Sequence, residues 1–236
     1  MTARAEDVSA RSSVSFLQQA MAIAAKDLRI EIRGRHALGT LLPFAATLLV
    51  SFGFAFGPGR DVLERTAPGL LWMATLFAAV MAARRSYQAE TEDDALEGLL
   101  LAPVDKAAVF LGKATAVALE LLVLVVAVLL MVVVLFDLSP GNPFALLAAF
   151  ALGTVGLAAV GGLFGVVAEA ERTREAVFPM LVLPLVTPVL IAGVRATDLA
   201  TTAQASEAAQ WLGLLLAFDI VFVSVGILVF GHLMED

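Results

Sequence analysis

The chain has 236 residues, of which 60% are hydrophobic and 16% are charged, and its formal net charge is −7. Soluble domains of ordinary composition are about half apolar and about one quarter charged, so this composition excludes a typical soluble domain. The acidic balance argues against a general role on nucleic acid, because phosphate binding requires clustered Lys and Arg. The chain has no cysteine, which excludes disulfides, thiolate metal sites and a cysteine nucleophile.

The N-terminal part is polar at first and then amphipathic. Residues 1–13 are expected to be disordered, and residues 14–35 are expected to form an interfacial amphipathic helix. In this second stretch apolar side chains recur at near-helical spacing between charged ones: Phe16, Leu17, Met21, Ala24, Leu28 and Ile32. A basic amphipathic helix just before a membrane span typically lies in the interface with its apolar face in lipid. The alternative is that it also frames a docking surface for a partner.

Six long apolar runs follow. A helix of about 20 apolar residues crosses a bilayer core of about 30 Å, and runs of roughly this length cover residues 37–57, 68–83, 114–136, 143–168, 176–194 and 211–233. The second is short unless Val62 and Leu63 extend it. The predicted fold is therefore all-α, a polytopic membrane protein whose residues 36–236 form one transmembrane domain.

The distribution of basic residues predicts the orientation. With the N-terminus placed inside, twelve of the fifteen Lys and Arg residues fall on the inner side, and only Arg60, Arg65 and Arg195 fall outside. Cytoplasmic loops carry the excess of Lys and Arg, so both termini are predicted to be cytoplasmic. The external connections are then residues 58–67, 137–142 and 195–210.

The segment at residues 90–104, ETEDDALEGLLLAPV, is the one markedly acidic stretch between apolar runs. Thr91 followed by Asp94 resembles a capping box, and Pro103 stops a helix. Its apolar side chains share one helical face: Leu96, Leu99, Leu100 and Val104. Its acidic side chains lie largely off that face: Glu92, Asp93 and Glu97.

This pattern predicts a short cytoplasmic helix whose apolar stripe contacts another protein. The alternatives are a solvated connector or a helix lying on the membrane surface. Surface binding is disfavoured because the cytoplasmic leaflet is itself negative and attracts basic segments.

Two spans have compositions that bear on packing and motion. The fourth is rich in glycine, which lets neighbouring helices approach closely, and we interpret this as packing rather than a ligand site. The fifth carries Pro179, Pro184 and Pro188, which break or kink a helix and free backbone carbonyls that protein or a cavity must cover. The fifth span is therefore the best candidate for a moving or pathway-lining helix.

Glu120 and Asp219 are the ionisable residues within spans. A carboxylate in a membrane is costly unless it is paired or protonated, so each is a functional hypothesis by default. Glu120 lies one to two helical turns from Lys113 and could pair or reach the interface. Asp219 lies eight residues into the last span, where structural pairing and a role in a polar pathway are both open.

No motif for catalysis or metal binding is present in the sequence. Gly112-Lys113 lacks the preceding glycine and the following Ser or Thr of a phosphate-binding loop. His36 and His232 both lie at predicted cytoplasmic span ends and supply no ligand set for a metal. We therefore do not predict an enzyme, and any ATP would be bound by a partner.

Three stretches together resemble the CcmB family, the haem exporter protein B family: KDLRIEIRGRHAL at residues 26–38, TEDDALEGLLLAPVDKAAVFLGK at residues 91–113 and VLPLVTPVLIAG at residues 182–193. The resemblance covers about residues 16–232. It implies the six-span permease subunit of an ATP-binding-cassette exporter for cytochrome c maturation in a bacterial cytoplasmic (inner) membrane. The acidic element with LEGLLLAP is shared loosely with the wider class of ABC-2-type exporters.

The resemblance also implies partners and site residues. A separate ATPase would dock on the cytoplasmic helix between the second and third spans, two permease copies are expected per complex, and the docking positions are Glu92, Asp93, Asp94, Leu96, Glu97, Leu99 and Leu100. The other implied partners are a haem-handling membrane protein, a small single-span subunit and a periplasmic haem chaperone. Haem would be the transported or handled ligand, not a directly bound cofactor. The alternatives are an ABC-2-type permease for a drug or glycan precursor and a membrane scaffold that moves nothing.

Overall fold

The computed structural model describes residues 15–35, 37–57, 59–91, 105–137, 141–170, 177–202 and 205–233, and these residues contain helices and no strand. The α-helices are α2 (Phe16–Gly34), α3 (Leu42–Phe56), α4 (Arg60–Thr91), α6 (Lys106–Phe136), α7 (Pro143–Ala170), α8 (Val177–Thr201) and α9 (Ala208–Leu233). A π-helical turn, η1 (Ala37–Leu41), leads into α3, and a 3₁₀ turn, η2 (Ala205–Glu207), leads into α9. The predicted all-α fold is confirmed. The predicted disorder of residues 1–13 lies outside the described residues.

Six of these helices contain stretches long and apolar enough to cross a membrane: Gly39–Phe56, Asp61–Ala83, Lys106–Phe136, Pro143–Phe164, Val182–Thr201 and Ala208–Phe230. The six predicted spans are therefore confirmed, with differences at their ends. The second extends through Val62 and Leu63. The third begins at Lys106 because the Asp105 side chain caps the helix, accepting a hydrogen bond of 2.9 Å from the backbone N–H of Ala107.

The connection expected between the fifth and sixth spans is shorter than predicted. Residues 195–201 are the last turns of α8 and not part of a loop. The polar residues in this stretch do not end the helix, since Arg195 and Asp198 lie an (i, i+3) step apart with 4.0 Å between their charged atoms. A helix that begins with apolar residues can continue past the bilayer core when its last turns carry such polar pairs.

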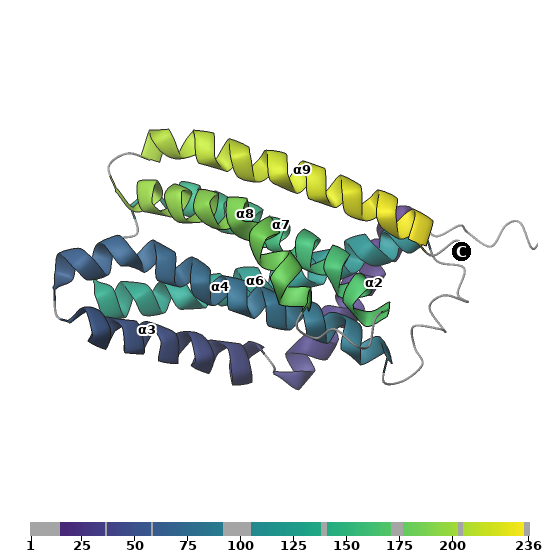
Figure 1. The fold of residues 1–236 in the computed structure, drawn as a ribbon, viewed down its shortest axis with the longest axis horizontal. Coiled ribbons are helices and arrows are strands. Elements are labelled where there is room, and N and C mark those ends of the chain that lie inside the picture. The colour runs from purple at the N-terminus through teal and green to yellow at the C-terminus, as the bar shows by residue number, and fades with distance from the viewer. Residues whose placement is uncertain are drawn as a thin grey trace, which may run out of the picture.

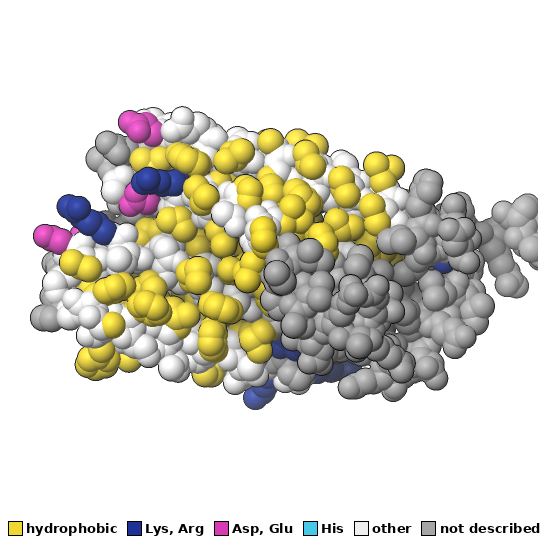
Figure 2. Space-filling model, in the orientation of Figure 1, with side chains coloured by type: hydrophobic (Ala, Val, Ile, Leu, Met, Phe, Trp, Pro, Cys, Tyr) yellow, Lys and Arg dark blue, Asp and Glu magenta, His cyan; other side chains and the backbone are white. Residues whose placement is uncertain are grey.

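The spans run along the length of the molecule, whereas α2 crosses them steeply at the end where the C-terminus lies (Figure 1). In Figure 2 hydrophobic side chains cover much of the part of the face that is not grey, and charged side chains gather at the left end of the molecule. A membrane protein needs such an apolar belt. We call the end crossed by α2 the α2 end.

The core of the bundle is formed around α4, α6 and α7. The helix α6 contacts α2, α3, α4, α7 and α9, and α7 contacts α4, α6, α8 and α9. At its centre the Trp72 ring of α4 is fully buried and lies against Phe150, with 6.2 Å between ring centroids. Its indole Nε1 donates a hydrogen bond of 3.0 Å to Thr197 Oγ1 in α8. Trp72 therefore joins three helices and does not face lipid.

Two glycines make room for this ring. A Cβ at Gly193 would lie 2.6 Å from Trp72 Cε2, and a Cβ at Gly153 would overlap the far edge of the ring. The interpretation of the glycines in the fourth span as packing residues holds at Gly153, because a larger side chain there would overlap the Trp72 ring.

We predict that Gly153→Ala destabilises the bundle by about 1–3 kcal/mol, the usual cost of overpacking a filled core. The measurement is the thermal midpoint of the purified protein in detergent. Gly213→Ala in α9 is the matched control, since no atom lies within 4 Å of a Cβ placed there. Equal melting behaviour of the two variants would contradict the packing we describe.

Candidate functional site

The helix α2 is fastened to the first turns of α6. In α2, Oε1 of the Gln19 side chain accepts a hydrogen bond of 2.9 Å from the backbone N–H of Asp105, the capping residue of α6. Further along, a Cβ at Gly112 would lie 2.7 Å from the Ala20 carbonyl oxygen and 2.8 Å from Ile23 Cβ. Gly112 is therefore the place where the two helices touch backbone to backbone, and not part of a phosphate-binding loop.

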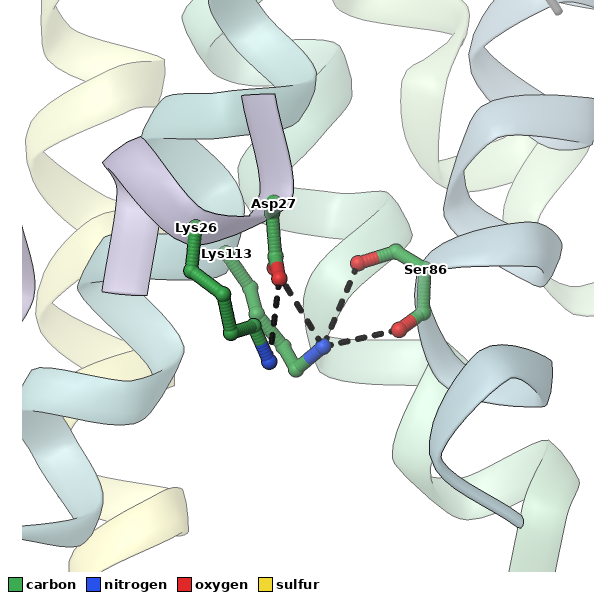
Figure 3. A network of polar contacts seen from close by, with 4 residues as sticks. All are labelled: Lys26, Asp27, Ser86 and Lys113. Atoms are coloured by element: carbon green, nitrogen blue, oxygen red, sulfur yellow. Dashed lines mark hydrogen bonds and ion pairs between the residues drawn. The ribbon is translucent and has the colours of Figure 1, made fainter. Parts of the chain in front are cut away.

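About two helical turns on from Asp105, a buried lysine joins three helices (Figure 3). The Lys113 side chain of α6 is 2% exposed, and its Nζ donates a hydrogen bond of 2.7 Å to the Ser86 carbonyl oxygen of α4. Nζ also lies 3.5 Å from Ser86 Oγ and 3.5 Å from Asp27 Oδ2 of α2. The other carboxylate oxygen of Asp27 lies 3.2 Å from Lys26 Nζ. We call Asp27, Ser86 and Lys113 the Lys113 network.

The contacts of the Lys113 network differ in kind. The carbonyl bond is short and directional, whereas the carboxylate at 3.5 Å supplies mainly opposite charge. A buried ammonium needs both, because an uncompensated charge in a low-dielectric site is strongly destabilising. The position of α2 across the spans thus depends on its carboxylate meeting this lysine.

A second polar contact joins α4 and α6 on the same side of α6. Arg85 donates a hydrogen bond of 2.6 Å to Glu120 Oε1, and the Glu120 side chain is only 9% exposed. Glu120 and Lys113 are seven residues apart and so lie on one face of α6. The sequence placed Lys113 as the neighbour of Glu120, but the ion pair of Glu120 is made across the helix interface with Arg85.

Both contacts lie close to the segment predicted to dock the ATPase. The helix α4 ends at Thr91, five residues after Ser86, and α6 begins at Lys106, seven residues before Lys113. Thr91, predicted to start the short docking helix, is the last residue of α4. The predicted docking positions lie outside the described residues: Glu92, Asp93, Asp94, Leu96, Glu97, Leu99 and Leu100.

Asp219 lies inside the bundle, on the side of α9 that packs on α7 and α8. Its side chain is 5% exposed, and neither carboxylate oxygen has a hydrogen-bond partner among the described residues. A Cβ at Gly156 of α7 would lie 2.8 Å from Asp219 Oδ1 and 3.2 Å from a methyl of Val189 in α8. Of the two alternatives left open by the sequence, structural pairing is not found within the described part of the chain.

The prolines of the fifth span do not interrupt the helix. Pro184 and Pro188 lie inside α8, which is continuous from Val177 to Thr201, and Pro179 is in its first turn. The prediction was a break or a kink: no break is found in α8, and its ribbon bends part-way along its length (Figure 1). Between the two prolines, the Thr187 hydroxyl donates a hydrogen bond of 2.9 Å to the Leu183 carbonyl oxygen. Hydroxyls of this kind are one way in which membrane helices tolerate proline.

Sequence reasoning missed three participants in these contacts: Asp27, Arg85 and Ser86. Asp27 is an acidic residue within a basic helix, and Arg85 looks like an ordinary cytoplasmic charge. The available signal was the seven-residue spacing of Lys113 and Glu120, which places two opposite charges on one inward face of the third span. Among the described residues no group of three His, Asp or Glu side chains is arranged to hold a metal ion.

We predict that Asp27→Asn loosens α2 and lowers stability by about 2–3 kcal/mol, because it removes an opposite charge 3.5 Å from the buried Lys113 ammonium. Hydrogen exchange of α2 amides and the thermal midpoint in detergent would both report this. Asp198→Asn is the control, since its pair with Arg195 is exposed and 4.0 Å apart and such pairs contribute about 0–1 kcal/mol. Unchanged exchange in α2 would show that the carboxylate does not hold the helix.

The chain is similar in sequence to known proteins. A model of the family described as CcmB protein matches residues 18–235. Heme exporter protein B of Rhodobacter capsulatus is 32% identical over 173 residues, covering 73% of this chain and 79% of that protein. Heme exporter protein B of Paracoccus denitrificans is 31% identical, over 74% of this chain and 80% of that protein. The protein of the same name from Bradyrhizobium diazoefficiens is 29% identical, over 87% and 92%. This six-span membrane protein belongs to the CcmB family.

Proposed function

We propose that this chain is the permease subunit of an ATP-binding-cassette transporter for cytochrome c biogenesis. It couples a separate ATPase to haem export or to the release of a haem-loaded periplasmic chaperone. The name shared by its relatives, heme exporter protein B, supports haem as the cargo. The observation that carries the coupling is the Lys113 network, which joins α2, α4 and α6. Ser86 lies five residues before the end of α4 and Lys113 seven residues after the start of α6, the two helices that flank the predicted docking segment.

The proposed orientation places both termini and the α2 end in the cytoplasm of a bacterial inner membrane. An even number of spans returns the chain to the side on which it began, and α2 and the C-terminal end of α9 lie at the same end of the molecule (Figure 1). The excess of Lys and Arg on the same side supports the inner assignment.

In this proposal the ATPase acts on the segment between α4 and α6. Its apolar stripe at Leu96, Leu99 and Leu100 provides the contact, and the acidic residues around it provide charge complementarity. Closure of the ATPase displaces the ends of α4 and α6. The short contacts of Lys113 with Ser86 and of Glu120 with Arg85 make those two ends move together.

The cargo-facing part of the proposal is α8 with its neighbours. Pro184 and Pro188 leave helix carbonyls without their usual N–H donors, and Asp219 faces the same helix from α9. These features make α8 the proposed moving or pathway-lining helix. Both histidines, His36 and His232, lie at predicted cytoplasmic span ends, so we propose that haem iron is ligated by the haem-handling partner and that this chain offers apolar contact. A single-span subunit, the haem chaperone and a second permease copy complete the proposed assembly.

A permease for a different cargo would use the same coupling geometry, so the relatives' shared name is what favours haem. A scaffold that moves nothing would not need, beside a proline-containing helix, a buried carboxyl group without a hydrogen-bond partner among the described residues. The presence of Asp219 in that position therefore favours a transporter.

The docking stripe can be tested by L96D/L99D/L100D. We predict that the ATPase no longer co-purifies with this variant and that the yield of c-type cytochromes falls about tenfold or more, because three charges replace the apolar contact. The matched control is G98D/L101D/A102D, which adds the same charge on the opposite side of the same predicted helix. Normal ATPase association by the stripe variant would remove the proposed docking site.

A second prediction separates a transporter from a scaffold. We expect Asp219→Asn, which keeps the shape but removes the ionisable group, to leave ATPase association intact and to reduce cytochrome c yield at least severalfold. The control is Asp61→Asn, which changes an acidic residue in the first turn of α4, at the end of the bundle opposite the α2 end. If assembly and cytochrome yield were both unchanged in Asp219→Asn, Asp219 would have no part in transport.

A further inference from the structure

The helix α2 presents three different sides. The side that packs on α6 carries Ala20, Ala24 and Asp27, which are buried or nearly so. The next side is apolar but exposed: Leu17 is 63%, Met21 63% and Ile32 67% accessible. The third side is basic. A helix that only packed on its own protein would need one apolar side, not two.

The basic side forms a shallow groove. Lys26, Arg29 and Arg33 follow one another at spacings of three and four residues and therefore lie along one side of the helix. The groove has a volume of about 450 Å³, and the described residues that line it include no acidic side chain: Ala22, Ala25, Lys26, Arg29, Ile30 and Arg33. Small residues between long cations leave room for an anion to approach the helix.

The position of α2 places both exposed sides at a membrane boundary. The helix crosses the ends of the spans (Figure 1), and only residues 35 and 36 separate it from the helical turn that opens the first span. Its contacts with Gly112 and Lys113 of α6 hold it at that depth. The exposed apolar side must therefore meet either acyl chains or another protein.

We infer that the basic groove of α2 binds the head groups of anionic phospholipids, while the adjacent apolar side of the same helix inserts among their acyl chains. A lipid has both chemistries in one molecule, a phosphate above two hydrocarbon chains, and α2 has a cationic side directly beside an apolar one. Basic residues at the membrane surface attract anionic lipids, and interfacial helices combine that attraction with apolar burial. The site does not depend on the proposed ATPase docking.

An acidic protein surface is the other occupant that charge alone would allow. It fits less well, because a protein bound only to the cations would leave Leu17, Met21 and Ile32 exposed.

The test uses the full-length chain purified in detergent, with phosphatidylglycerol or phosphatidylcholine added and bound lipids measured by native mass spectrometry. The main variant is R29Q/R33Q, which leaves the Lys26–Asp27 ion pair untouched. We expect wild type to prefer phosphatidylglycerol and the variant to lose about tenfold to thirtyfold in affinity for it, since each basic residue near a membrane surface contributes roughly fivefold. Affinity for phosphatidylcholine should not change.

Two further variants make the result specific. R29K/R33K keeps the charge and should keep the preference, whereas R65Q/R195Q removes two arginines at the other end of the bundle and should have no effect. If a double variant does not fold, R29Q and R33Q alone give the same comparison, because both side chains are exposed. The inference is overturned if R29Q/R33Q keeps the preference, or if R65Q/R195Q loses it equally. It is also overturned, in favour of protein binding, if R29Q/R33Q keeps lipid binding but the ATPase no longer co-purifies with this variant.

Discussion

The burial of one lysine determines how the α2 end is built. Lys113 comes from α6, but its short hydrogen bond comes from the backbone of α4 and its counter-charge from α2. Because a buried ammonium is tolerated only when it is compensated, segments 86 and 27 residues away in sequence must meet there. Gly112 lies next to Lys113, and a Cβ at this position would collide with α2. The glycine at residue 112 and the long-range contact of Lys113 with Asp27 therefore favour the same crossing of α2 over α6.

Asp219 shows the opposite arrangement. It is as well buried as the core, yet no described side chain or backbone group bonds its oxygens. Gly156 allows it to lie against α7, so the site accommodates the carboxylate in space but does not satisfy it. Local rules are usually broken at functional positions. The bundle therefore has a compensated lysine where α2, α4 and α6 meet and, beside α8, a carboxyl group without a hydrogen-bond partner in the described part of the chain.

The number and order of spans could be predicted from sequence because a bilayer imposes a length on apolar runs. The partners of the charged residues could not, since they depend on the rotation and depth of each helix. Glu120 illustrates this: its face was predictable, but its pairing with Arg85 of α4 was not. Of the break or kink expected in α8, the break is not found, because proline removes one backbone donor without ending a helix that its neighbours support. The docking positions at residues 92–100 remain predictions.

The attachments of α2 indicate where motion should occur. Its principal helix contact is α6, which is linked in turn to α4 by Lys113 and Glu120. If α2 is also held by lipid head groups, then α4 and α6 are tied to the plane of the membrane at their proposed cytoplasmic ends. A force that the ATPase applies to the segment between α4 and α6 then cannot easily displace α2, α4 and α6 together. The displacement should then pass to the helices packed on its far side, α7, α8 and α9, where Pro184, Pro188 and Asp219 lie.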